Sequence, residues 1–289
     1  MPVGDTYKRL PADQSSMYVL AVVGPDDTAR RGLRDRFVAA LSAEGTVAAV
    51  ERSAESTPPA ADRRGDGVET AVAVGSEGWL ATGTDRQIPD VVDDLAPTHD
   101  YCVLDDVVDA NVPGVVLGDA DFAGEVLASG ESVEDVDVGA VVDALHDRIP
   151  HETLDSLVER AKRAPGAEFA GAIATFTGRV RARDDPDDER TTHLEFETYR
   201  GVTAERMAAI EAELEEREGV HEVVMHHRTG VVAAGEDIVF VVVLAGHRPE
   251  AFATVSDGID RLKDEVPIFK KEATTDGEFW VHDRESGAE

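Results

Sequence analysis

The first half of the chain alternates short apolar runs with segments of helical periodicity, and this alternation restricts the folds it can adopt. Residues 17–23 (MYVLAVV) form an apolar run of strand length, and residues 29–43 then carry apolar side chains at helical spacing. The runs TVAAVE, VETAVAVGS, YCVLDD and GVVLG follow, with two more helical patterns among them. Strands that alternate with helices form a mostly parallel sheet with helices on its faces. We therefore predict an α/β domain over residues 17–148, preceded by a flexible N-terminus at 1–16.

The second half follows a different pattern. A helix over 151–164 leads into the strand sequence AGAIATFTGRVRARDD, and later strands read THLEFETY, VHEVVMHHRTG and EDIVFVVVLAG. Helices are expected at 202–217 and 249–265, and Pro267 ends the second of them. Consecutive strands that alternate apolar and polar residues are typical of antiparallel sheets. The pattern predicts a largely antiparallel α+β domain over residues 149–285.

The charge of the chain argues against a nucleic-acid partner. The 289 residues hold 60 carboxylates against 28 lysines and arginines, a formal net charge of −32, and the acids are spread over both halves. Nucleic-acid binding requires clustered positive charge. Acid excess with scarce lysine resembles proteins of salt-loving archaea, and at about 1 M salt the Debye length is only about 3 Å. An anion site in such a protein has to work by direct contacts.

Other bulk features bear on location and redox chemistry. No apolar run approaches the roughly 18–20 residues of a membrane span, and the N-terminal sequence lacks the apolar core of a secretory signal. We therefore expect a cytoplasmic protein without a membrane partner. Cys102 is the only cysteine, which excludes an intrachain disulfide and a multi-cysteine metal site. The histidines show no metal-ligand spacing, so we assign no metal and expect no cofactor.

Three of the five lysines in the chain, Lys263, Lys270 and Lys271, fall within nine positions. Lys263 lies at the expected C-terminal end of a helix, where the dipole alone favours a cation by about 0.3–1 kcal/mol. Two neighbouring ammonium groups at 270 and 271 repel each other, which favours a neutral amine that can act as a base or nucleophile. The alternative is a solvated surface cluster. We interpret 263–271 as an anion-handling site.

Two further cationic patterns fit the same chemistry. In GRVRAR, alternation along a strand places Arg179, Arg181 and Arg183 on one face, where phosphate is a natural ligand. Pairing with the acidic loop DDPDDE beyond them is the alternative. His247 and Arg248 stand at a strand-to-helix junction, where backbone N–H groups attract anions.

The loop GPDDTARR after the first strand occupies the position of a phosphate loop. That motif requires Gly-Lys-Ser/Thr where this chain has Ala29, Arg30 and Arg31. Asp26 and Asp27 would repel phosphates, and although Arg30 can partly replace the lysine, no hydroxyl follows it for magnesium. The loop argues against hydrolysis of GTP or ATP. It leaves open a scaffold descended from a nucleotide binder or a nucleotide-responsive adaptor.

Residues 151–285 resemble the large, catalytic subunit of molybdopterin synthase, the MoaE family. The matching segments are GAIATFTGRVR, LEFETY, MHHRTGVVAAGEDIVFVVVLAGHR and LKDEVPIFKKEATTDGEFWV. The resemblance implies sulfur transfer to cyclic pyranopterin monophosphate, giving molybdopterin. The implied donor is the thiocarboxylated Gly-Gly C-terminus of a small ubiquitin-like subunit. This chain ends in SGAE, so we expect the donor to be a separate protein.

The resemblance also implies roles for single residues. Lys263 and Lys270 match the catalytic lysines of the family, and Phe269 stands where the family usually has tryptophan. Arg284 matches an arginine that is lent to the neighbouring subunit, which implies a homodimer within a heterotetramer. The remaining substrate-contacting positions are Arg179, Val180, Arg181, His247, Arg248, Lys271 and Glu272.

The first half resembles, through strand order and loop position, the MobB adaptor family of molybdenum cofactor synthesis, which has a phosphate-loop fold. Two other functions therefore stay open beside sulfur transfer. The first is an adaptor in molybdopterin guanine dinucleotide synthesis that binds nucleotide through Arg30. The second is an acceptor of ubiquitin-like conjugation at Lys263 or Lys270.

Overall fold

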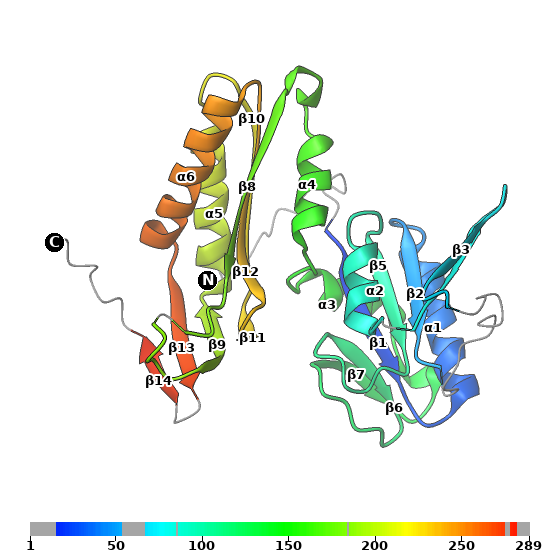
Figure 1. The fold of residues 1–289 in the computed structure, drawn as a ribbon. Coiled ribbons are helices and arrows are strands. Elements are labelled where there is room, and N and C mark those ends of the chain that lie inside the picture. The colour runs from blue at the N-terminus through cyan, green and yellow to red at the C-terminus, as the bar shows by residue number, and fades with distance from the viewer. Residues whose placement is uncertain (1–15, 54–66, 85, 184, 275–277, 282–289) are drawn as a thin grey trace, which may run out of the picture. The chain divides into compact units, whose positions relative to one another are not determined.

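The computed structural model describes residues 16–53, 67–84, 86–183, 185–274 and 278–281, and it divides into two compact units, Met1–Ser156 and Leu157–Glu289 (Figure 1). The flexible segment predicted at 1–16 lies outside the described residues except for Ser16, and so does Arg284. The unit boundary follows Ser156, whereas the sequence pattern placed a boundary after residue 148. In the described part of the chain, no helix has both the length and the apolar character needed to cross a membrane.

The first unit contains the predicted parallel sheet. Five strands pair in the order β2-β5-β1-β6-β7, and every pairing is parallel. Helices α1 and α3 cover one face and α2 lies on the other, each over its own apolar cluster. The bounds are β1 Tyr18–Val23, α1 Asp27–Leu41, β2 Val47–Glu51, α2 Ile88–Leu95, β5 Tyr101–Asp105, β6 Gly114–Leu117, β7 Val126–Gly130 and α3 Val138–His146.

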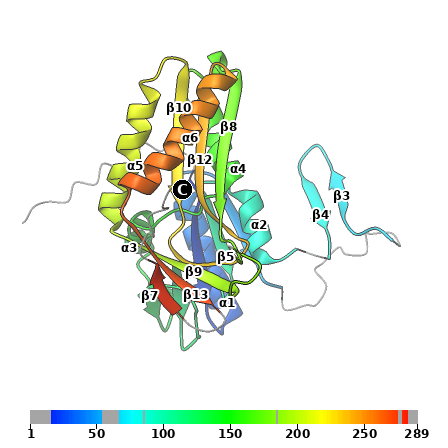
Figure 2. The ribbon, with the colours of Figure 1, turned by 60° about the vertical axis from the view of Figure 1, so that its left-hand side comes forward.

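A separate hairpin interrupts this unit between β2 and α2 (Figure 2). Strands β3 (Ala71–Val74) and β4 (Trp79–Thr82) pair antiparallel in a two-stranded sheet of their own. The register Val72↔Ala81 and Val74↔Trp79 puts these four side chains on one face, and all of them are exposed. The run VETAVAVGS, which was predicted to form a strand, contains β3 of this hairpin.

The second unit is the predicted α+β domain. Its described strands form two antiparallel sheets, β10-β12-β8 and β11-β9-β13-β14. Figure 1 shows α5 and α6 side by side on one face of the first sheet, where they enclose the main core of this unit. The bounds are α4 Leu154–Lys162, β8 Ala172–Arg179, β9 Thr191–Thr198, α5 Arg200–Glu215, β10 Val220–His227, β11 Gly230–Ala233, β12 Asp237–Ala245, α6 Arg248–Glu265, β13 Ile268–Thr274 and β14 Glu278–Val281.

Helix α6 lies close against this sheet because of a glycine near its middle. A Cβ atom at Gly258 would lie 3.0 Å from Val241 Cγ1 and 3.1 Å from Met225 Cε. A side chain at this position would require Val241 or Met225 to shift by a few tenths of an ångström, so glycine favours the close approach of α6 to the sheet. The two sheets meet where Ile238 and Ile268 pack against both the main core and a smaller apolar cluster. That junction is where β13 leaves the end of α6.

Two glutamates between α5 and β10 have raised pKa values. Glu211 Oε1 accepts a hydrogen bond of 2.6 Å from Met225 N, yet burial raises the pKa of Glu211 to about 7. Burial, followed by repulsion from Glu215, raises the pKa of Glu222 to about 7. Both carboxyl groups therefore bind their protons more tightly in the folded unit than in the unfolded chain.

This difference predicts how stability depends on pH. A raised pKa contributes stability that is fully present below the unfolded value of 4.5 and lost as the pH rises through about 7. We expect the free energy of unfolding to fall by the order of 2 kcal/mol between pH 5 and pH 8, measured by urea titration at constant salt. Glu211→Gln should flatten this slope, whereas Glu216→Gln, on the exposed side of the same helix end, should leave it intact. Equal slopes in both variants would contradict the assignment.

Candidate active site

Helix α6 carries cationic side chains at both ends. His247 is the N-cap residue, Arg248 begins the helix, and both are exposed. The His247 side chain makes no hydrogen bond to the first turn, so it does not fill the anion-attracting position there. Lys263 lies in the last turn, where the helix dipole favours a cation.

The two ends of α6 are too far apart to share one pocket. Lys263 lies sixteen positions after His247, and a helix rises 1.5 Å per residue, so the two positions lie about 24 Å apart along the axis. The sequence interpretation placed the His247–Arg248 pair beside the catalytic lysines. Within one chain the structure does not bring them together, because one continuous helix of 18 residues connects them.

Lys263 lies over an aromatic ring of the neighbouring sheet. Its Nζ is 5.9 Å from the centroid of the Phe176 ring, which belongs to β8 and packs against the main core. A ring face attracts an ammonium group through its quadrupole, which restrains an otherwise flexible side chain. The sequence did not identify Phe176 as part of the site, because the contact depends on how α6 crosses β8.

Lys270 and Lys271 point to opposite faces of β13. Lys270 is registered opposite Phe196 of β9, on the face that carries the smaller apolar cluster. Lys271 is registered opposite Glu195, and its Nζ lies 3.6 Å from the Glu195 carboxylate. Successive side chains on a strand alternate between faces. The side chains of Lys270 and Lys271 therefore lie on opposite faces of β13. The prediction that their two ammonium groups repel each other at close range is wrong for this reason.

The arginines of GRVRAR do not form the predicted row on one strand face. Strand β8 ends at Arg179, whose Nε lies 3.1 Å from Asp237 Oδ1 and whose Nη2 donates to the Gly235 carbonyl. The next residue turns inward: the Val180 side chain is buried, and its backbone pairs with the 235–236 turn. Arg181 and Arg183 follow outside the strand.

This ending changes the roles expected in that segment. Arg183 Nη1 donates to the Pro186 carbonyl at 2.9 Å, which supports the alternative of pairing with the acidic loop. Arg181 is exposed. The Val180 side chain cannot contact a substrate from the apolar cluster that it shares with Leu194, Phe196 and Val232. Val180 positions the two arginines beside it.

Two more groups complete the surroundings of β13. Glu272 accepts a hydrogen bond from the Thr191 hydroxyl group. Phe269 is exposed and makes an edge-to-face contact with Tyr199, with ring centroids 5.7 Å apart. Tyr199 was not a candidate from the sequence, although exposed aromatic side chains beside cations are a common signal of a binding surface.

The second unit is thus an α+β unit in which three lysines lie at the C-terminal end of α6 and on the adjoining strand β13. The family model described as MoaE protein matches residues 146–265. A probable molybdopterin synthase from Haloferax volcanii is 53% identical over 270 residues, which cover 93% of this chain and 100% of that protein. The chain belongs to the MoaE family of molybdopterin synthases, and its function lies in molybdenum cofactor biosynthesis.

Other similar proteins match a smaller share of the chain. The molybdopterin synthase catalytic subunit of Bacillus subtilis is 40% identical over 115 residues, which cover 40% of this chain and 72% of that protein. The crystal structure of molybdopterin synthase from Staphylococcus aureus is 30% identical and covers 44% of this chain and 90% of that chain, with a TM-score of 0.40. These names describe an enzyme, in agreement with the expectation from the lysines.

The first unit has a weaker match. The structure of a MobB protein homolog from Bacillus stearothermophilus is 16% identical, covers 45% of this chain and 99% of that chain, and has a TM-score of 0.33. A likeness of this size supports no conclusion about function. The role of the first unit has to be argued from its own residues.

Proposed function

We propose that the chain is the catalytic subunit of a molybdopterin synthase and acts as a sulfurtransferase. Its substrate would be cyclic pyranopterin monophosphate, and its sulfur donor the thiocarboxylated C-terminus of a small ubiquitin-like subunit. The observation that carries the proposal is the placement of Lys263 and Lys270 on either side of the turn at Val266 and Pro267, in a chain of this family. The name of the B. subtilis relative, a catalytic subunit, implies at least one further subunit in that enzyme.

The reaction joins two anions, so the chain has to supply positive charge. The acyl–sulfur bonds of two donor molecules break, and each sulfur forms a carbon–sulfur bond to the pterin side chain in place of a carbon–oxygen bond that breaks there. The displaced oxygen leaves as water or stays with the phosphate, and water supplies the oxygen that restores each donor carboxylate. An ammonium group beside the acyl carbon stabilises the developing oxyanion. Lys270, held on the inner face of β13, is suited to that position. Lys263, restrained over Phe176, is suited to exchange a proton with the departing sulfur.

The arginines would hold the phosphate of the substrate. Arg179 is already paired with Asp237. A phosphate therefore has to displace that carboxylate from the guanidinium group or bind to other N–H groups of the same arginine. A guanidinium group offers several donors, which lets one arginine contact both. In high salt such direct contacts retain their strength better than long-range attraction does.

The length of α6 supports a site that is shared between two copies of the chain. Since His247 and Arg248 lie about 24 Å from Lys263, they would contact substrate bound to the lysines of a second copy. A test is to co-express Lys263→Ala and Arg248→Ala chains. Each variant alone should be inactive, and the mixture should recover roughly a quarter of wild-type activity, because half of the dimers then contain one intact site. A mixture as inactive as its components would show that one chain supplies both groups.

The proposed reaction is tested by reconstitution. Purified chain, thiocarboxylated small subunit and the cyclic precursor are mixed in high-salt buffer, and the dithiolene product is detected by oxidation to its fluorescent derivative. The unmodified small subunit, which ends in a carboxylate, is the matched control. Product formation only with the thiocarboxylate is the expected result, and its absence under saturating donor would overturn the assignment. The intact mass of the same mixture reports conjugation at Lys263 or Lys270.

A further inference from the structure

The first turn of α1 is the position where a nucleotide phosphate would bind in this kind of sheet. Ligands of open parallel sheets bind at the carboxyl ends of the strands where the strand order reverses. In the first unit β1 lies between β5 and β6, and α1 begins four residues after β1 ends. The anion would be held by the free backbone N–H groups of the first helical turn.

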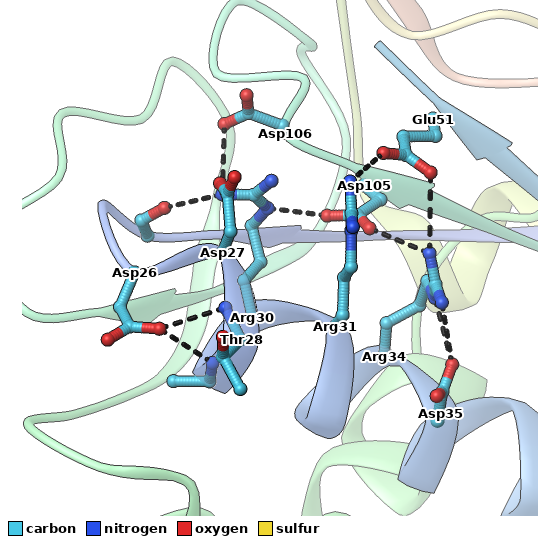
Figure 3. Close-up of polar contacts among 12 residues, drawn as sticks. Asp26, Asp27, Thr28, Arg30, Arg31, Arg34, Asp35, Glu51, Asp105 and Asp106 are labelled. Atoms are coloured by element: carbon cyan, nitrogen blue, oxygen red, sulfur yellow. Dashed lines mark hydrogen bonds and ion pairs between the residues drawn. The ribbon is translucent and has the colours of Figure 1, made fainter. Parts of the chain in front are cut away.

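Those N–H groups are already occupied by the chain itself. Asp26 is the N-cap residue, and its Oδ1 accepts hydrogen bonds of 2.9 Å from both Thr28 N and Ala29 N (Figure 3). Asp27 adds a second carboxylate to the same turn. The dipole of α1 is therefore neutralised by a fixed carboxylate in the position that a phosphate oxygen would take.

Arg30, the cation that replaces the lysine of a phosphate loop, is also paired within the chain through its Nε and Nη1 atoms. Its Nε lies 2.5 Å from Asp105 Oδ1, and its Nη1 donates to the Gly24 carbonyl at 2.9 Å and contacts Asp27 at 2.9 Å. Only 5% of the Arg30 side chain and none of the Asp105 side chain is exposed. The guanidinium group is turned into the protein and cannot reach a ligand without giving up its contact with the buried Asp105 carboxylate.

The strand ends around Arg30 reinforce this arrangement. Arg34 Nη1 contacts the other oxygen of Asp105 at 2.9 Å, and Glu51 at the end of β2 pairs with both Arg31 and Arg34. Asp106 adopts a left-handed backbone with φ of 63°, which is costly for a residue other than glycine and directs its carboxylate toward Arg30 at 3.7 Å. The network contains three guanidinium groups and six carboxylates (Figure 3), so its net charge repels polyphosphates.

We infer that the loop after β1 and the first turn of α1 bind no nucleoside triphosphate, because the Asp26 carboxylate and Arg30 guanidinium of the chain occupy the positions of the phosphate and its cation. The network instead joins the carboxyl ends of β1, β2 and β5 to α1. The unit is a structural module whose phosphate site is closed from within. This inference concerns the first unit alone and does not depend on sulfur transfer by the second.

The inference is tested on the full-length wild-type chain with GTP or ATP and magnesium in high-salt buffer. Equilibrium dialysis should show no saturable binding with a dissociation constant below about 0.1 mM. Hydrogen–deuterium exchange with and without about 1 mM nucleotide should leave peptides covering residues 24–34 unchanged, since the Asp26 cap stays in place. A phosphate-loop protein that binds nucleotide in the same buffer is the positive control.

Each result decides the question. Absence of binding, or binding that leaves exchange in residues 24–34 unchanged, supports closure of the site. Saturable binding that protects the amides of residues 24–34 would overturn it, because the phosphates would then have displaced the Asp26 carboxylate. The wild-type chain alone is sufficient, so the outcome does not depend on whether a variant folds.

Discussion

Replacement of Lys263 or Lys270 by alanine is expected to abolish formation of molybdopterin while leaving the second unit folded. Loss of a group that stabilises charge in the transition state typically costs about 10²–10³-fold in rate. Neither side chain is part of the apolar core, so circular dichroism and the melting temperature should match wild type. The measurement is the initial rate of dithiolene formation with saturating thiocarboxylated donor.

Two further variants sharpen that experiment. Lys162→Ala removes an exposed lysine of α4 that pairs only with Glu159 among the contacts described, and it should retain wild-type activity. Lys270→Arg keeps the positive charge but not an amine that loses its proton readily. Partial activity in Lys270→Arg would indicate that charge matters more than proton transfer at this position. Wild-type rates in both Lys263→Ala and Lys270→Ala would contradict the proposed roles of these two lysines.

Replacement of Asp105 by asparagine is expected to destabilise the first unit strongly. The substitution leaves the buried Arg30 guanidinium without its closest anionic partner, and removal of one member of a buried pair costs about 3–5 kcal/mol. For a unit of this size the melting temperature should fall by roughly 10 °C. Differential scanning calorimetry of the full-length chain measures the shift.

The chain offers a matched control for that substitution. Asp109 pairs with Arg52 at the same distance of 2.5 Å, but 66% of its side chain is exposed. Asp109→Asn should cost about 0–1 kcal/mol, because exposed ion pairs contribute little and are screened by salt. Equal shifts for Asp105→Asn and Asp109→Asn would show that the Arg30 network does not hold the strand ends together.

Local sequence patterns were sufficient to predict both sheet types. The apolar runs in the first half have strand length and alternate with helical patterns, and the structure confirms a parallel sheet there. The alternating strands of the second half form antiparallel sheets, as predicted. The strand that was expected to include Arg183 ends at Arg179, because Val180 is drawn into a small apolar cluster and its backbone pairs with the 235–236 turn. Such long-range pairing leaves no mark in the local pattern.

The site was only partly predictable for a related reason. The lysines around the turn at Pro267 could be found from their clustering in a chain with few lysines. Glu195 pairs with Lys271 and Asp237 pairs with Arg179, and both pairs depend on strand register. In the first unit, Asp105 pairs with Arg30 although the two lie 75 residues apart in the sequence. The separation of His247 from Lys263 could have been calculated from the predicted helix over 249–265. A continuous helix is a rigid spacer, so its length fixes the distance between the residues at its two ends.

Gly258 in α6 allows the helix to pack closely on the sheet between its two ends. At Gly258, α6 packs closely against Val241 and Met225, and this position lies between Arg248 and Lys263 in the helix. A larger residue here would require Val241 or Met225 to shift by a few tenths of an ångström. The packing beneath α6 would then change between Arg248 and Lys263, although neither of those side chains had been altered.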